Sequence, residues 1–92
     1  EIIINHLAIK RMIENQQSLL PSGIYQVKGQ FNKGAVIRII DTYGNEIGCG
    51  VVNFSSGELK LLTEQGLDIA INPPFVMDIN LFVCYSDVPI TV

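Results

Sequence analysis

The side chains that could take part in chemistry are few in this chain, and their spacing predicts no catalytic set. The single histidine, His6, lies at the start of an expected helix, and no serine or cysteine partner can be assigned to it. Two cysteines and one histidine without short spacing do not form a zinc site. The scattered carboxylates are Asp41, Glu46, Asp68 and Asp78. Since no pair of them has a spacing that demands acid–base work, we expect no catalytic, metal-binding or cofactor-binding residue.

Gly48 and Gly50 raise the question of a phosphate-binding loop. Such a loop needs a following Lys-Ser or Lys-Thr pair and a helix whose amide end faces the phosphate. Neither follows here, because both glycines lie inside an expected strand. Glycine within a strand marks a bend or bulge where a small sheet curls. We therefore expect these residues to shape the sheet.

The length and composition indicate one globular domain over residues 1–92. Of the 92 residues, 48% are hydrophobic and 16% are charged, which is too apolar for a disordered chain. The net charge of −3 is opposite in sign to that of a general nucleic-acid binder, which needs Lys and Arg to replace the counterions of phosphates. No apolar run approaches the roughly 20 residues of a membrane span, so we expect no membrane partner.

Cys49 and Cys84 both lie in apolar, strand-like runs. They are expected to be reduced, buried thiols in a cytoplasmic protein, with a disulfide as the alternative. The chain begins with Glu1 rather than Met. We therefore expect it to be a C-terminal piece of a longer polypeptide or a processed chain.

The apolar periodicity and the capping residues predict two short helices. Asn5 is the expected N-cap of a first helix that runs to about Gln16. Its core stripe, at helical spacing, consists of Ala8, Ile9, Met12 and Ile13. Ser55 and Glu58 form a capping box that opens the second helix, and Gly66 is the expected end of that helix.

Strands make up most of the rest of the chain. They are expected at residues 1–4, 24–28, 35–41, 46–54, 67–72 and 75–85. The dense apolar run 35–41 predicts a strand that is buried on most of both faces. In the turn before residue 24, Gly23 can adopt a positive φ. Pro89 lacks the N–H that an inner strand needs, so we expect the tail to be an edge strand or a loose strand. The predicted fold is mainly β with two short α-helices, in the order β-α-β-β-β-α-β-β, as a curled sheet that closes on itself.

Several ordered motifs resemble those of one known family. They are Ser18–Ile24, Val27–Phe31, Gly34, Asp41, Gly44 and Gly50–Leu59, followed more loosely by Asn80–Val83. In this order they resemble the PUA domain, in the version found at the C-terminal end of bacterial glutamate 5-kinase. The resemblance covers residues 1–62 well and 75–83 loosely. It implies a PUA-like pseudo-barrel.

The resemblance also implies an accessory role. In glutamate 5-kinases, ATP phosphorylates the γ-carboxylate of glutamate, the first step toward proline, on a separate N-terminal amino-acid-kinase domain. The implied partner of this chain is therefore an upstream amino-acid-kinase domain in the cytoplasm. ATP and Mg²⁺ would bind that domain, and this chain would need no cofactor and would be non-catalytic by itself.

RNA binding is the second hypothesis, because PUA domains of RNA-modifying enzymes bind RNA, often through the glycine-containing loop after the first helix. The matching loop residues and the basic residues near them are Pro21, Ser22, Gly23, Lys10, Arg11, Lys28 and Lys33. The alternative is that these are ordinary solvated charges and that Phe31 is a core or hairpin residue rather than a base-stacking platform. A third hypothesis is a protein-interaction domain that forms a homo-oligomer through its apolar C-terminal strand.

Overall fold

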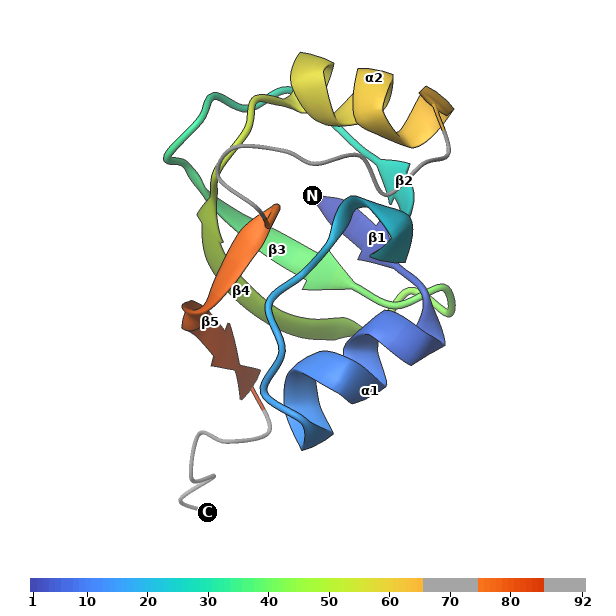
Figure 1. Cartoon of the computed structure of the whole chain (residues 1–92), viewed down its shortest axis with the longest axis vertical. Helices are drawn as coiled ribbons and strands as arrows, with labels where there is room; N and C mark the ends of the chain where they lie inside the picture. The colour runs from blue at the N-terminus through green and yellow to red at the C-terminus, as the bar shows by residue number, and fades with distance from the viewer. Residues whose placement is uncertain (66–74, 86–92) are drawn as a thin grey trace.

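The computed structural model describes residues 1–65 and 75–85 (Figure 1). The elements in chain order are β1 (Ile2–Ile4), α1 (His6–Glu14), the 3₁₀ turn η1 (Pro21–Gly23), β2 (Ile24–Val27), β3 (Val36–Ile40), β4 (Glu46–Val52), α2 (Ser56–Gln65) and β5 (Met77–Cys84). The mainly-β class with two short helices is confirmed. The strand expected at 67–72, the helix end at Gly66 and the tail around Pro89 lie outside the described residues.

The described strands form one mixed sheet in the order β2-β1-β3-β4-β5. Strand β1 runs parallel to β3 and antiparallel to β2, whereas β3, β4 and β5 are successive antiparallel neighbours. Strand β4 curves along its length, so the sheet curls (Figure 1). Among the described strands the sheet order ends at β2 and β5, and the expected closure by strand pairing is not made.

The segment before η1 links β5 to the opposite part of the sheet. Leu19 forms an isolated antiparallel bridge with Met77. Its N–H donates to the Met77 carbonyl at 3.0 Å, and its own carbonyl accepts from the N–H of Val76 at 2.7 Å. Because η1 and β2 follow Leu19 directly, this bridge holds β5 to the segment that leads into the other edge strand. The curled sheet and this link give the pseudo-barrel.

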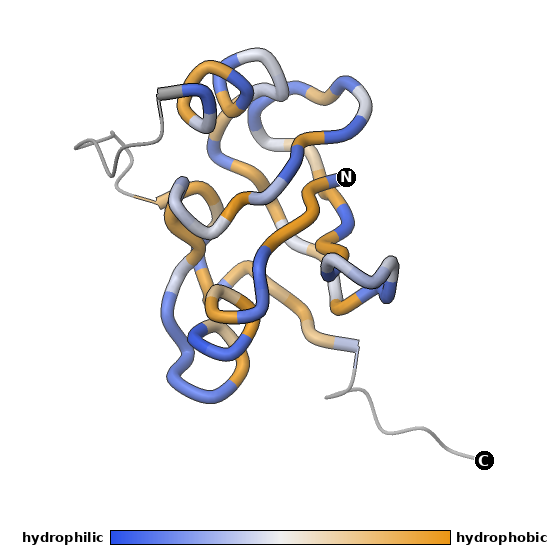
Figure 2. Tube along the Cα trace, turned by 90° about the vertical axis from the view of Figure 1, so that its right-hand side faces the viewer, coloured by the Kyte–Doolittle hydropathy of each residue, from blue (hydrophilic) through white to orange (hydrophobic). Residues whose placement is uncertain are grey.

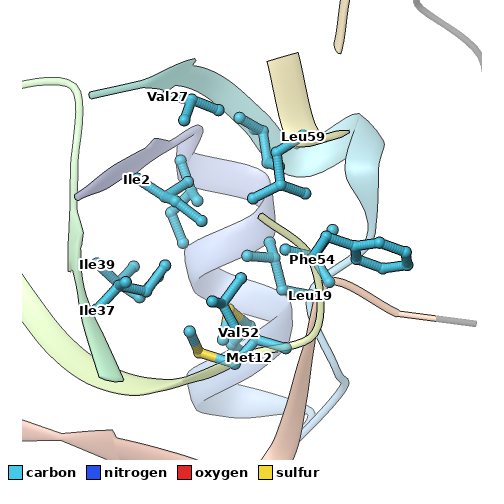
Figure 3. Close-up of a cluster of buried hydrophobic side chains, with 13 residues drawn as sticks. Ile2, Met12, Leu19, Val27, Ile37, Ile39, Val52, Phe54 and Leu59 are labelled. Carbon is cyan, nitrogen blue, oxygen red and sulfur yellow. The ribbon is translucent and has the colours of Figure 1, made fainter. Parts of the chain in front are cut away.

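The hydrophobic core lies between the inner face of the sheet and the two described helices. In Figure 3, Ile2, Ile39 and Val52 of the sheet point toward the same interior as Met12 of α1 and Leu59 of α2. The buried cluster consists of Ile2, Ile4, Met12, Leu19, Ile24, Val27, Ile37, Ile39, Val52, Phe54, Leu59, Val76 and Met77. Figure 2 shows the first strand, beside the N mark, as a hydrophobic segment. Burial of this apolar surface is the main favourable contribution to folding.

Strand β3 differs from the prediction that both of its faces are buried. Its side chains alternate, with Ile37 and Ile39 buried in the core and Val36 and Arg38 exposed on the other face. Consecutive residues of a strand point to opposite faces of the sheet, so burial of both would require a second covering layer. The sequence alone could not exclude such a layer, because β-branched residues favour a strand on either face.

Gly48 and Gly50 are needed because β5 passes very close to β4. A β-carbon at Gly50 would lie 2.8 Å from the Leu81 carbonyl oxygen, and one at Gly48 would overlap the Val83 carbonyl oxygen. The β4–β5 register also shifts between Gly50 and Val52. The predicted role in shaping the sheet is confirmed, and close strand approach is its physical cause.

Both predicted helix caps are confirmed. The Asn5 side chain accepts from the N–H of Ala8 at 2.8 Å. Ser55 Oγ accepts from the Glu58 N–H at 3.2 Å, and Glu58 Oε1 accepts in return from the Ser55 N–H at 3.1 Å. These bonds satisfy amide groups that have no partner inside the helix. Neither α1 nor α2 is long and apolar enough to cross a bilayer.

Candidate functional site

A cavity of about 210 Å³ lies between α1 and the segment that leads into η1. It is lined by Asn5, Leu7, Ala8, Arg11, Met12, Gln17, Ser18, Leu19, Leu20, Ser22 and Gly23. We call this space the α1–η1 cavity. It collects residues from the helix and from the Leu-Leu-Pro-Ser-Gly motif that the sequence singled out.

Asn5 joins the two walls of the α1–η1 cavity. Its side-chain oxygen caps α1, its side-chain amide donates to the Ser22 carbonyl at 3.3 Å, and its main-chain N–H donates to the Gly23 carbonyl at 2.9 Å. Pro21 occupies the first position of η1, where a missing N–H and a fixed φ suit a helical turn. One asparagine therefore sets the position of η1 against the start of the helix.

Gly23 is required by contact with the helix and not by its backbone torsion. Gly23 does not use the positive φ that a glycine allows in this turn, since the described glycines with positive φ are Gly29, Gly34 and Gly44. A β-carbon at Gly23 would lie 2.7 Å from Cβ of Ala8 and 3.0 Å from Cδ1 of Leu19. The glycine thus lets η1 approach α1 closely.

The residues predicted to touch RNA do not form one surface. Arg11, Ser22 and Gly23 line the α1–η1 cavity, and buried Pro21 belongs to η1. Lys10 lines a shallow depression on another side of α1, together with His6, Leu7, Ile9, Ile13 and Glu14. Lys28 and Lys33 are exposed, and neither lines the α1–η1 cavity. The predicted residues therefore fall into two groups, one at the α1–η1 cavity and one of separate exposed lysines.

The lining of the α1–η1 cavity suits binding and not turnover. Arg11 supplies a guanidinium group, and amide and hydroxyl groups come from Asn5, Gln17, Ser18 and Ser22. None of the lining residues is a carboxylate, a histidine or a cysteine, so the lining offers neither a general base nor an activated thiol. A guanidinium beside amides and hydroxyls can bind a carboxylate, a phosphate or a nucleobase edge.

Sequence reasoning missed Gln17 and Ser18 as cavity residues. Ser18 Oγ accepts from the N–H of Ile79 at 3.0 Å, a contact across 61 positions of sequence. The Gln17 N–H donates to the Arg11 carbonyl at 3.1 Å and folds the segment back onto α1. Gln16 has a positive φ of 51°, which turns the chain there. Only the position of Ser18, at the start of the recognised motif, could have indicated such a role.

Phe31 follows the structural alternative and not the base-stacking one. It is half-buried and packs against the core cluster. Its N–H donates to Ser56 Oγ at 3.2 Å, and its carbonyl accepts from the Ser56 N–H at 3.0 Å. These bonds fix the loop before β3 to the start of α2.

Asp41 is the titratable group with the densest set of hydrogen bonds among the described residues. Burial acts to raise its pKa, but bonds from Asn45 and Tyr43 and the nearby charge of His6 outweigh burial, so the pKa lies below its ordinary value of 3.8. Asp41 Oδ1 accepts from the main-chain N–H of Tyr43 at 2.9 Å and of Asn45 at 2.8 Å. The Tyr43 ring in turn lies 5.3 Å from the His6 ring, edge to face. Asp41 therefore organises a turn that touches the start of α1.

The cysteines and the carboxylates build no catalytic or metal centre in the described parts of the chain. Cys49 is half-buried and Cys84 is buried, and the two do not pair in a disulfide. The expected full burial holds for Cys84 but not for Cys49, and their reduced state stays a prediction. Within residues 1–65 and 75–85, no group of three or more His, Cys, Asp and Glu side chains could hold a metal ion.

Comparison with known proteins identifies curated relatives over nearly the whole chain. Glutamate 5-kinase 2 of Bacillus licheniformis is 37% identical over 91 residues, which is 98% of this chain and 24% of that protein. Glutamate 5-kinase of Meiothermus ruber is 44% identical over 65 residues, covering 71% of this chain and 17% of that protein. The chain thus spans about a quarter or less of the length of these relatives.

Solved structures share the fold. A PUA domain from Aeropyrum pernix, crystallised with tartrate, has a TM-score of 0.64 and 20% identity, covering 71% of this chain and 35% of that one. A conserved PUA domain protein from Thermoplasma acidophilum has a TM-score of 0.57 and 23% identity, covering 65% of this chain and 39% of that one. The family model of the PUA domain matches residues 1–72. The chain belongs to the PUA domain family.

Proposed function

We propose that residues 1–92 form one accessory PUA domain of a cytoplasmic glutamate 5-kinase-like protein in proline biosynthesis. The observation that supports this most directly is the 37% identity to a glutamate 5-kinase over 98% of the chain. The domain is non-catalytic by itself. An amino-acid-kinase domain upstream binds ATP, Mg²⁺ and glutamate and transfers the phosphoryl group.

The chemistry of the described residues favours an accessory role over a catalytic one. Phosphoryl transfer depends on positioned cations and on carboxylates that hold Mg²⁺. The α1–η1 cavity has Arg11 but no acidic ligand, and the described parts of the chain have no metal-binding cluster. Cys49 and Cys84 do not form a disulfide with each other, in agreement with a reducing compartment such as the cytoplasm.

The test is an assay of the protein encoded by the whole reading frame that contains this chain. We expect glutamate-dependent release of ADP from ATP by the full-length protein. A truncated protein that lacks residues 1–92 should keep measurable turnover with altered kinetic constants. A reading frame without an amino-acid-kinase domain, or a full-length protein without glutamate-dependent turnover, would reject the proposal.

RNA binding remains a second candidate because Arg11, Ser22 and Gly23 converge on one cavity. This candidate predicts that the 92-residue chain binds a structured RNA hairpin at low salt and that added salt weakens binding as phosphate contacts are lost. Arg11→Ala should reduce the affinity several-fold, whereas the control Lys60→Ala on α2 should not. Absence of binding at low ionic strength, or equal loss in both variants, would reject it.

A further inference from the structure

The outer face of the sheet, on the side away from the core, carries a patch of apolar side chains. We define this outer patch as Val36, Cys49, Val51, Leu81, Val83 and Tyr85. The exposed fractions are 68% for Val36, 51% for Leu81, 53% for Val83 and 38% for Tyr85. Cys49 and Val51 are half-buried between them. The patch therefore presents aliphatic and aromatic surface to the surroundings from three adjacent strands.

Strand register makes the outer patch continuous. Val36 of β3 lies opposite Val51 of β4, and Cys49 of β4 lies opposite Val83 of β5. Residues directly opposite each other on neighbouring strands share a face with side chains in contact distance. Tyr85 adds to the same surface, because burial and the neighbouring Cys49 thiol raise the pKa of its hydroxyl.

A charged border runs along one side of the outer patch. Arg38 lies opposite Cys49 in the register of β3 and β4. Its Nη2 lies 3.2 Å from Glu1 Oε2, and its Nη1 lies 3.0 Å from Glu46 Oε1. Glu1, the first residue of the chain, is thus held at the edge of the patch. An apolar centre with a polar rim is the usual arrangement of an interface.

We propose that the outer patch docks the kinase domain that precedes Glu1 in the longer protein. This inference rests on the proposed function. Glu1 is ion-paired with Arg38 at the border of the outer patch. A domain joined to the chain before Glu1 therefore lies next to the patch without a long linker. The curated relatives are about four times as long as this chain, which leaves room for such a domain.

The size of the outer patch favours a tethered domain over a second copy of the chain. A stable interface between separate proteins takes about 20–30 residues on each side. The patch consists of the few side chains named above. A covalently joined domain is present at a high effective concentration, so a smaller interface is enough to hold it.

Hydroxyl-radical footprinting read by mass spectrometry measures this docking at the level of side chains. Oxidation of Leu81 and Tyr85 is compared between the 92-residue chain and the full-length protein. We expect oxidation of both residues to fall several-fold in the full-length protein. Oxidation of Tyr25 and Leu61, which are 69% and 61% exposed elsewhere on the surface, should stay the same. Equal oxidation of Leu81 and Tyr85 in both proteins would overturn the inference.

A matched pair of variants controls for misfolding. Val83→Glu places a charge in the outer patch and should restore the oxidation of Leu81 and Tyr85 in the full-length protein to the level of the isolated chain. Leu61→Glu, at a similarly exposed position on α2, should leave it low. Both variants of the isolated chain should melt at the wild-type temperature, because both side chains are largely exposed. Restored oxidation in both variants, or in neither, would overturn the inference.

The glutamate kinase assay on the same preparations separates this inference from the proposed function. A full-length protein that phosphorylates glutamate but shows unchanged oxidation of the outer patch contradicts the docking alone. A reading frame without a kinase domain contradicts both. Sedimentation of the isolated chain as a dimer that Val83→Glu dissociates would assign the patch to a second copy and overturn docking of the kinase domain.

Discussion

Gly48 of β4 lies so close to β5 that a β-carbon at this position would overlap the carbonyl oxygen of Val83. The obstacle is main chain, which cannot rotate away as the end of a side chain can. Two atoms of the Phe82 ring would also lie 2.9 Å from that β-carbon. The packing of β5 on β4 therefore depends on a hydrogen atom at Gly48.

Gly48→Ala should destabilise the domain by about 1–3 kcal/mol or more, because the overpacked strand must shift. Gly57→Ala is the control, since the nearest atom to a β-carbon there is Ser55 Oγ at 4.0 Å and Gly57 lies in α2. Alanine in a helix is neutral or stabilising by about 0.5–1 kcal/mol relative to glycine. Urea unfolding of both variants measures the difference, and equal stability of the two would contradict the close approach.

Stability should fall in acid because Asp41 loses its charge. Its pKa is depressed in the folded state, so the group stabilises the fold above its unfolded value of 3.8, and this contribution is lost as the pH falls through the lower folded pKa. Urea unfolding of wild type and Asp41→Asn should differ at pH 7, and the difference should shrink as the pH falls below 3.8 and through the lower folded pKa. The control Glu14→Gln, on an exposed helix position, should follow the wild type. A constant gap between wild type and Asp41→Asn would contradict this role.

Much of the fold could be predicted from local signals. Asn5 and the Ser55/Glu58 pair marked the helix starts because capping is a matter of a few neighbouring residues. The β3–β4 hairpin followed from its turn, where Gly44 has a φ of 90°. Features that depend on residues distant in the sequence could not be predicted. Val36, for example, is exposed because no other described element covers its face of the sheet, and the local sequence does not show this.

The candidate site was only partly predictable for the same reason. The motif around Pro21 indicated the loop, and the structure places Arg11 beside it. The role of Ser18 depends on a hydrogen bond to Ile79 of β5, which no spacing rule along the chain could indicate. The sequence indicated only that Gly23 could adopt a positive φ, whereas the close contact with Ala8 explains why a glycine is needed there.

The contact between Gly23 and Ala8 predicts a specific rescue. Gly23→Ala should destabilise the domain by about 1–3 kcal/mol, because its new methyl group meets the Ala8 methyl at 2.7 Å. Ala8→Gly alone should cost about 1 kcal/mol through its lower helix propensity. The double variant should be more stable than the sum of the two losses predicts, as a double-mutant cycle of urea unfolding measures. Additive losses would contradict the contact.

Removal of the capping box should weaken α2. Ser55→Ala leaves the Glu58 N–H without its acceptor and should cost about 1 kcal/mol of unfolding free energy. Glu58→Gln is the control, since a glutamine side chain can still accept from the Ser55 N–H. Chemical denaturation of both variants measures the effect. A loss in Glu58→Gln as large as in Ser55→Ala would show that charge, and not the reciprocal hydrogen bonds, stabilises this helix start.

The central claim is that this PUA domain supports a kinase and has no turnover of its own. The most direct measurement is ADP release by the purified 92-residue chain in the presence of ATP, Mg²⁺ and glutamate, beside the full-length protein at equal concentration. The account predicts glutamate-dependent turnover by the full-length protein and none above background by the 92-residue chain. Glutamate-dependent turnover by the 92-residue chain would contradict it.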